Sequence, residues 1–181
     1  HNEQIEIVQF HQSYGYEDFV QGIRPVTDGT GNLQYRVVPG IFLQLCDRAR
    51  KNPAQDFVLI IDEINRGNLS RIFGELLMLL EYREKRVRLP YAPADSADDS
   101  GYIRIPKNLY LIGTMNSTDR SLAMIDYALR RRFYFYRLMP VEGGNAPVLS
   151  RWLSNKSTYS PAERAIVLDY FLSINRAISQ K

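Results

Sequence analysis

The chain of 181 residues has little cysteine and no long apolar run. Cys46 is its only cysteine, so an internal disulfide is excluded, and we expect a buried, unreactive thiol of the kind found in the reducing cytoplasm. The longest apolar runs, residues 58–61 and 76–80, fall far short of the roughly 20 residues that a membrane-spanning helix needs. No repeat or low-complexity tract is present. With 45% hydrophobic and 24% charged residues, the composition predicts a globular domain with its own core and no membrane contact.

Two apolar segments each end abruptly at polar residues. Residues 57–61 are followed by Asp62 and Glu63, and residues 109–115 are followed by Asn116. An uninterrupted apolar run is typical of a strand that is covered on both faces in a parallel sheet. Ligands of such sheets bind at the carboxyl ends of the strands. We therefore predict an α/β fold with these three polar side chains at one edge of the sheet.

An Asp-Glu pair at that edge suits the hydrolysis of a nucleoside triphosphate. The first carboxylate holds Mg²⁺, usually through its water shell, and the second orients or deprotonates the attacking water. The alternative is a buried strand that ends in two solvated acids, since a short string of this type often arises by chance. The surrounding residues favour the first interpretation.

Three strings around these residues resemble the AAA+ NTPase family. Residues 62–68 read DEINRGN, residues 115–121 read MNSTDRS, and residues 126–133 read DYALRRRF. The second string resembles the McrB branch in particular, the GTP-hydrolysing motors of modification-dependent restriction systems. The resemblance extends from about residue 5 to residue 140. It implies an αβα sandwich of the AAA+ type, built on a parallel sheet.

The phosphate-binding loop of that family is absent from these 181 residues. Such a loop reads G-x-x-x-x-G-K-[ST], and its backbone N–H groups cradle the phosphates. The glycine pair at residues 143–144 is followed by Asn145 and lacks the Lys-Ser/Thr. We expect a segment that begins after strand 1, the loop and helix 1 of the family fold. Residues 1–142 would then be the truncated core and residues 143–181 the start of the helical lid; a relative that has lost the loop is the alternative.

The resemblance implies a role for each polar residue of the site. Asp62 would bind Mg²⁺, and Glu63 would be the base that activates water. Asn116 matches the sensor that touches the γ-phosphate or the attacking water, and a plain strand cap is its alternative role. Asp119 and Arg120 belong to the branch-specific string and are expected to help arrange the nucleotide, which would be GTP in preference to ATP.

Three adjacent arginines, Arg130, Arg131 and Arg132, lie where AAA+ proteins carry their arginine finger. A finger reaches into the phosphates bound by the neighbouring subunit, and its planar, permanently charged guanidinium suits that contact. Our order of preference for the catalytic arginine is Arg131, Arg132, Arg130. If Arg130 is not the finger, we expect it to bind nucleotide. One of the three could instead pair with Asp126, and another could be solvated.

The net charge of +3 is distributed unevenly. Residues 101–181 contain 12 Lys/Arg against 5 Asp/Glu, whereas residues 1–100 contain 11 against 15. This asymmetry fits a head-to-tail ring, and it also fits contact with nucleic acid. The resemblance implies a homo-oligomeric ring, a partner endonuclease similar to McrC, and DNA bound through the parent protein in the cytoplasm. A MoxR-like remodelling ATPase and a nucleotide-free assembly module are the alternatives; MNSTDRS argues against the first, and the missing loop supports the second.

Local patterns predict the remaining elements. They are a strand at residues 5–10, a hairpin tip at 27–32, helices at 41–51, 68–81, 122–129 and 161–179, a hairpin from 87–89 and 102–105, and a strand at 133–138. In the AAA+ strand order 5-1-4-3-2, loss of strand 1 leaves residues 109–114 and 133–138 without their common neighbour. We expect this gap to be filled in one of three ways: by residues 133–138 moving beside residues 109–114, by a strand from a second copy of the chain, or by an upstream segment of a longer chain.

Overall fold

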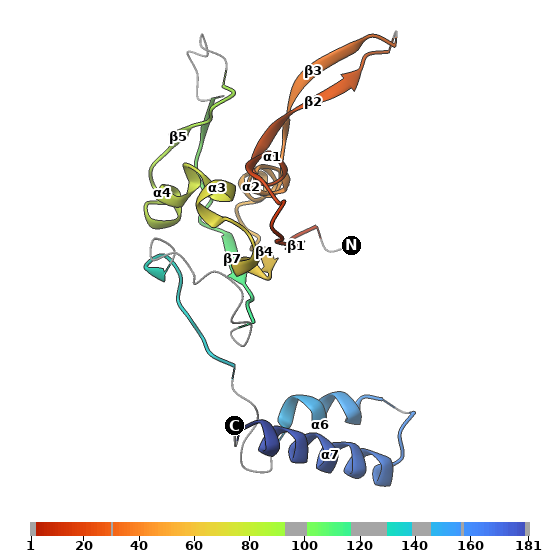
Figure 1. Ribbon diagram of the computed structural model, residues 1–181. Helices are drawn as coiled ribbons and strands as arrows, with labels where there is room; N and C mark the ends of the chain where they lie inside the picture. The colour runs from red at the N-terminus through yellow and green to blue at the C-terminus, as the bar shows by residue number, and fades with distance from the viewer. Residues whose placement is uncertain are drawn as a thin grey trace. The chain divides into compact units, whose positions relative to one another are not determined.

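The computed structural model describes residues 3–29, 31–92, 101–116, 130–138, 146–156 and 158–179. The chain divides into two compact units, His1–Tyr134 and Phe135–Lys181. Among the described residues, the strands lie in the first unit, and the second contains two helices (Figure 1). No helix in the described ranges is both long enough and apolar enough to cross a membrane.

Three parallel strands form the central sheet of the first unit. They are β1 (Ile5–Gln9), β4 (Phe57–Asp62) and β7 (Leu109–Gly113), and they pair in the order β1-β4-β7. Because Ile5 lies opposite Val58 and Phe57 opposite Leu109, the three strands end at nearly the same level. The parallel α/β sheet predicted from the uninterrupted apolar runs is therefore confirmed.

The core lies on one face of this sheet. Leu59, Ile61 and Leu109 are fully buried there, whereas Tyr110 and Ile112 on the opposite face are 49% and 51% exposed. The cover consists of helix α2 (Ile41–Lys51) and the short helices α1 (Tyr16–Phe19) and α3 (Leu69–Phe73). Successive residues of a strand point to opposite faces of the sheet. The described helices cover one face, so they bury at most every second residue of the apolar runs in β4 and β7.

Phenylalanines join the covering helices to each other. The ring centroid of Phe19 in α1 lies 5.2 Å from that of Phe42 in α2 and 4.9 Å from that of Phe73 in α3. All three side chains are fully buried. Such aromatic contacts add to the free energy gained from burial of apolar area. Helix α2 has the predicted bounds, and Asn52 ends it.

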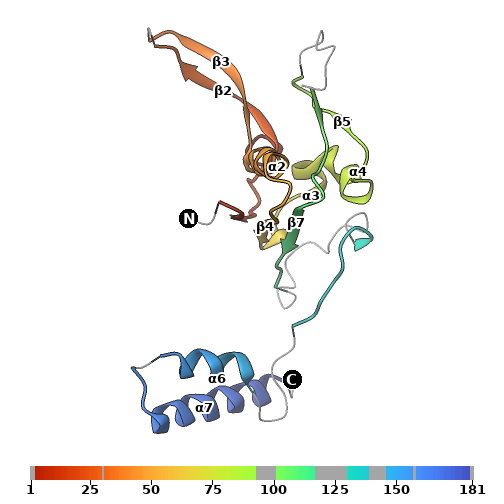
Figure 2. The same cartoon turned by 180° about the vertical axis from the view of Figure 1, so that it is seen from behind.

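Two antiparallel hairpins project from the first unit. Strands β2 (Gln21–Thr27) and β3 (Leu33–Pro39) form the longer one, with its tip at the turn predicted for residues 27–32. Strands β5 (Val87–Arg88) and β6 (Tyr102–Ile103) form the shorter one, as predicted. Figures 1 and 2 show both hairpins extending to the same side of the unit. Residues 93–100, which connect β5 and β6 in the sequence, lie outside the described residues.

The single helix predicted for residues 68–81 is wrong, because two helices occupy this segment. Helix α3 ends at Gly74, which has φ +50°, and α4 (Leu76–Glu81) begins two residues later. A Cβ atom at Gly74 would lie 3.1 Å from the ring of Tyr16, so glycine suits both the backbone angle and the contact. The predicted cap is present, since the Asn68 side chain accepts a hydrogen bond from the Arg71 N–H.

The strand predicted for residues 133–138 is also wrong. The structure has no strand there, and β7 pairs with β4 alone among the described strands. Tyr134, Tyr136 and Leu138 are almost fully exposed. This aromatic segment does not pair with β7, and a strand cannot form without a neighbour to complete its backbone hydrogen bonds. Pairing with a second copy or with an upstream segment stays a prediction.

The second unit is a pair of helices, α6 (Pro147–Ser154) and α7 (Pro161–Ser179). Helix α7 has the predicted bounds and a reciprocal cap. The Glu163 N–H donates to Ser160 Oγ at 3.3 Å, and the Ser160 N–H donates to Glu163 Oε2 at 2.8 Å. Helix α6 was not predicted, although Pro147 at its first position is a recognised start signal. The predicted helix at residues 122–129 and the glycine pair at residues 143–144 lie outside the described residues.

Candidate functional site

Asp62 lies at the carboxyl edge of the sheet, as the last residue of β4. Its backbone carbonyl accepts a hydrogen bond from the Phe10 N–H at 2.9 Å, so β1 and β4 remain paired at this position. Its Oδ2 atom accepts a longer hydrogen bond of 3.3 Å from the side chain of Gln9. The carboxylate is therefore held at the end of the strand by the strand's own neighbour.

Thr114, which the sequence patterns did not single out, contacts this carboxylate from the end of β7. Its hydroxyl donates to Asp62 Oδ1 at 2.5 Å, a length typical of a hydrogen bond to an ionised carboxylate. The hydroxyl oxygen of Thr114 also accepts a hydrogen bond from the Glu63 N–H at 3.4 Å. The available signal was a hydroxyl residue directly after an apolar run, on the strand next to the acidic pair.

The backbone of Thr114 also extends the pairing of β4 with β7. Its N–H donates to the Ile61 carbonyl, and its carbonyl accepts from the Ile64 N–H, both at 2.9 Å. Gly113 permits this close approach, because a Cβ atom there would lie only 2.8 Å from Ile64 Cδ1. The chain after the acidic pair is thus fastened to the end of β7.

Glu63 has an unusual backbone. With φ 53° and ψ 45°, it is the one non-glycine residue with a positive φ in the described part of the chain. This conformation is unfavourable for most residues and is concentrated at functional sites. It turns the chain sharply from β4 into the short helix η1 (Ile64–Arg66).

The Glu63 side chain forms an ion pair with Arg66. Oε2 lies 3.2 Å from Arg66 Nε in an ion pair, but it is buried and makes no hydrogen bond with good geometry. The side chain is 21% exposed. The carboxylate as a whole is partly exposed, and an exposed carboxylate can accept a hydrogen bond and a proton from a water molecule.

Asn116 is exposed and lies two residues beyond Thr114, at the same edge of the sheet as the acidic pair. The end of β7 therefore supplies two polar side chains beside the end of β4. Asp119, Arg120 and Asp126 lie outside the described residues, so their predicted roles stay predictions.

The three arginines differ in their surroundings. The Nη2 atoms of Arg132 and Arg131 lie 3.1 Å and 3.4 Å from the same Glu81 Oε2 atom, at the end of α4. The Arg132 side chain is 9% exposed, whereas that of Arg131 is 56% exposed and Arg130 is exposed as well. Which of the three arginines is the finger stays a prediction.

The donor set fits a Mg²⁺ ion that is only partly bound by protein. The described residues contain no group of three or more His, Cys, Asp or Glu side chains able to hold a metal ion. Mg²⁺ typically uses one or two carboxylates, several waters and the phosphates of a substrate. Asp62, with its hard oxygen atoms at the end of a strand, meets that requirement.

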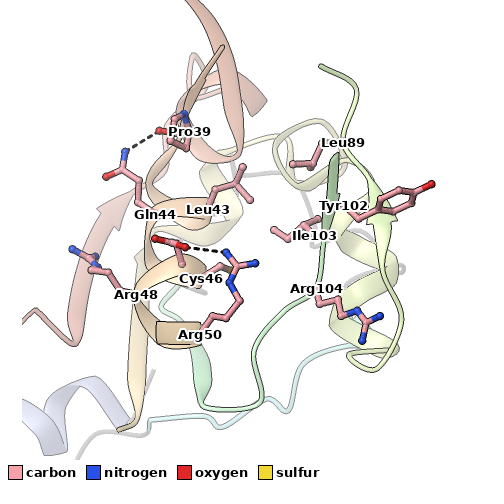
Figure 3. Close-up of a pocket in the computed structure, with 11 residues that line it drawn as sticks. Pro39, Leu43, Gln44, Cys46, Arg48, Arg50, Leu89, Tyr102, Ile103 and Arg104 are labelled. Atoms are coloured by element: carbon pink, nitrogen blue, oxygen red, sulfur yellow. Dashed lines mark hydrogen bonds and ion pairs between the residues drawn. The ribbon is translucent and has the colours of Figure 1, made fainter. Parts of the chain in front are cut away.

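A separate cleft of about 570 Å³ lies between α2 and the β5–β6 hairpin (Figure 3). Two of its basic side chains form ion pairs, Arg48 with Glu6 at 2.6 Å and Arg50 with Asp47 at 3.0 Å. Cys46 lines the cleft, and burial raises the pKa of its thiol to about 12. The prediction of a buried thiol is confirmed, and the raised pKa keeps it protonated and unreactive. None of the predicted site residues lines this cleft.

The chain is similar to proteins of known family. The AAA domain family, in its dynein-related subfamily, matches residues 1–133. The EcoKMcrB subunit of the type IV methyl-directed restriction enzyme of Escherichia coli is 45% identical over 154 residues, which are 85% of this chain. Component YdiS of the type II restriction enzyme BsuMI of Bacillus subtilis is 32% identical over 133 residues, or 68% of this chain.

A solved structure supports the fold. The crystal structure of a protein assigned as an ATPase from Cytophaga hutchinsonii matches with a TM-score of 0.50 and 16% sequence identity, over 86% of this chain and 40% of that one. The chain spans 32% of the E. coli subunit and 37% of the B. subtilis component, about a third of each relative. The chain belongs to the AAA family, in its dynein-related subfamily, and is McrB-like within it.

Proposed function

We propose that this chain is the catalytic segment of an NTPase motor that hydrolyses GTP in preference to ATP and drives a DNA restriction system. The observation that carries the proposal is the Asp62–Glu63 pair at the end of β4, held against Thr114 at the end of β7. Support for the biological setting comes from the names of the two relatives, both of which are restriction enzyme components. Support for GTP comes from the McrB-like string MNSTDRS.

In the proposed mechanism, each polar residue has one task. Asp62 binds the water shell of Mg²⁺, and Glu63 takes a proton from the attacking water. Asn116 orients that water or the γ-phosphate, while Asp119 and Arg120 arrange the nucleotide. Bound Mg²⁺ supplies charge neutralisation on the phosphates.

The same proposal includes an assembly. An arginine of the 130–132 run enters the site of the neighbouring subunit, which requires a homo-oligomeric ring. The acidic first half of the chain and the basic second half are complementary in charge, as a head-to-tail ring requires. A McrC-like endonuclease would be the partner subunit, and DNA would bind through the full-length protein in the cytoplasm.

Hydrolysis assays on the full-length protein test this function. GTP and ATP are supplied separately at equal concentration with Mg²⁺, and the Glu63→Gln protein controls for contaminating enzymes. We expect turnover of GTP to exceed that of ATP. Preference for ATP would favour the MoxR-like remodelling ATPase, and no turnover of either nucleotide would favour the assembly module.

A further inference from the structure

Thr114 contacts three successive residues of the acidic turn. Its hydroxyl donates to Asp62 Oδ1 at 2.5 Å and accepts from the Glu63 N–H at 3.4 Å, while its carbonyl accepts from the Ile64 N–H at 2.9 Å. A threonine hydroxyl has one donor and two acceptor sites, so one side chain can make both hydroxyl contacts at once. Valine has the same shape and can make neither.

These contacts involve the two groups whose orientation matters for hydrolysis, the Asp62 carboxylate and the Glu63 backbone. The hydrogen bond to Oδ1 fixes the rotation of the Asp62 carboxylate and leaves Oδ2, which has only the 3.3 Å contact with Gln9, for a water of the metal shell. The contact with the Glu63 N–H lies at the residue with φ 53°, where the direction of the Glu63 side chain is set. One hydroxyl thus orients the metal-binding group and supports the strained turn that presents the base.

We propose that Thr114 is a positioning residue of the hydrolytic site, which orients Asp62 for Mg²⁺ and Glu63 for water. This inference rests on the proposed function. Residues that orient metal-binding side chains typically change metal affinity or activity by about 10–100-fold when they are replaced. The hydroxyl itself lies at an exposed position, where water can replace its hydrogen bonds in the folded protein. Its loss therefore affects the reaction much more than the stability.

Three variants of the full-length protein test the inference: Thr114→Val, Thr114→Ser and Thr27→Val. The last removes an exposed hydroxyl from the β2–β3 hairpin and serves as the matched control. For each protein, we would measure kcat and KM for GTP, the Mg²⁺ concentration that gives half-maximal rate, and the melting temperature. Calorimetry with a non-hydrolysable GTP analogue over a series of Mg²⁺ concentrations reports on metal-dependent binding without turnover.

We expect Thr114→Val to lower kcat by about 10–100-fold, to raise the half-saturating Mg²⁺ concentration, and to leave the melting temperature close to that of the wild type. Thr114→Ser and Thr27→Val should keep the wild-type Mg²⁺ dependence. If Thr114→Val does not fold, Thr114→Ala removes the same hydroxyl without the crowding of a branched side chain.

The result that would overturn the inference is a Thr114→Val protein with the kcat and Mg²⁺ dependence of the wild type. A fall in melting temperature with unchanged Mg²⁺ dependence would overturn it as well, because it would show a purely structural role. A wild-type protein that hydrolyses neither GTP nor ATP would overturn the proposed function instead. In that case the calorimetric Mg²⁺ series still reports whether Thr114 orients Asp62.

Discussion

The two ends of the β4–β7 strand pair are built differently. At the amino end, the side chain of Asn108 donates to three backbone carbonyls, at 2.7 Å to Gln55, 2.9 Å to Ala49 and 3.1 Å to Asn52. Arg83 donates to the Leu109 carbonyl at 2.6 Å. Both side chains donate hydrogen bonds to main-chain oxygen atoms. These bonds connect α2 and the segment that follows α4 to the strands.

At the carboxyl end, side chains contact each other. Thr114 donates to Asp62, and Glu63 pairs with Arg66 yet keeps an oxygen without a hydrogen bond. The backbone there includes the left-handed Glu63. The polar side chains at the amino end of the strand pair therefore bind the main chain, whereas those at the carboxyl end bind each other, where we propose the nucleotide site.

The largest expected effect concerns an arginine that acts on the carboxyl end of a neighbouring subunit. In the full-length protein, Arg131→Ala should lower the rate of hydrolysis by about 10³–10⁵-fold if Arg131 is the finger. Arg132→Ala should lower the melting temperature more than Arg131→Ala does, because the Arg132 side chain is almost buried beside Glu81. Steady-state rates and thermal unfolding of the two variants separate the roles.

Mixed rings identify the subunit on which the arginine acts. A finger variant and a Glu63→Gln variant damage different halves of each interface, so mixtures should recover activity where an intact base meets an intact finger. If no mixing ratio restores turnover, the arginine acts within its own subunit.

The next effect tests the carboxyl end itself. Glu63→Gln preserves size and polarity but removes the base, so hydrolysis should fall by about 10²–10⁴-fold while nucleotide binding persists. Asp62→Asn should instead weaken Mg²⁺-dependent binding, because a neutral amide is a poorer ligand for a hard cation. Rates together with calorimetric affinities distinguish the two outcomes. A Glu63→Gln protein with more than about a tenth of the wild-type rate would contradict the assignment of the base.

At the amino end of the β4–β7 strand pair, we expect a substitution to lower stability and not to impair hydrolysis directly. Asn108→Ala removes the donor to three carbonyls and should destabilise the first unit by about 1–3 kcal/mol. For a domain of this size, each kcal/mol corresponds to a fall of about 2–4 °C in melting temperature. Gln34→Ala, which loses two exposed side-chain hydrogen bonds, to Asp28 and from Arg36, is the control and should have little effect. A loss of hydrolysis without a change in melting temperature for Asn108→Ala would break the contrast between the two ends.

The sequence predicted those features that depend on local pattern. The runs at 57–61 and 109–112 indicated parallel strands because every residue in them is apolar, but only one face is covered, since Tyr110 and Ile112 are 49% and 51% exposed. Helices α2 and α7 matched their predicted bounds because Asn52 and the Ser160–Glu163 cap mark their ends. The placement of Asp62 at the sheet edge followed from the general location of ligands in such sheets.

Other features depend on contacts that no local pattern contains. The break at Gly74 requires the Tyr16 ring, which comes from a helix far away in the sequence. The strand wrongly predicted for residues 133–138 shows that an aromatic run also needs a neighbouring strand. Thr114 matters because it pairs in register with the end of β4, and Glu81 because two arginines reach it; both are long-range relations.

The smallest expected signal comes from the 181-residue chain on its own. The described carboxyl end of the sheet presents Asp62 and Glu63, which accept hydrogen bonds and repel phosphate. These 181 residues contain no G-x-x-x-x-G-K-[ST] string, whose backbone N–H groups would donate hydrogen bonds to the phosphates. We therefore expect the isolated chain to bind Mg²⁺-GTP or Mg²⁺-ATP weakly or not at all, although the full-length protein binds it. Titration calorimetry of both proteins under identical conditions measures the difference. Micromolar binding by the isolated chain would show that the acidic edge is complemented by donors within this segment, and the contrast between the two ends of the sheet would need a different explanation.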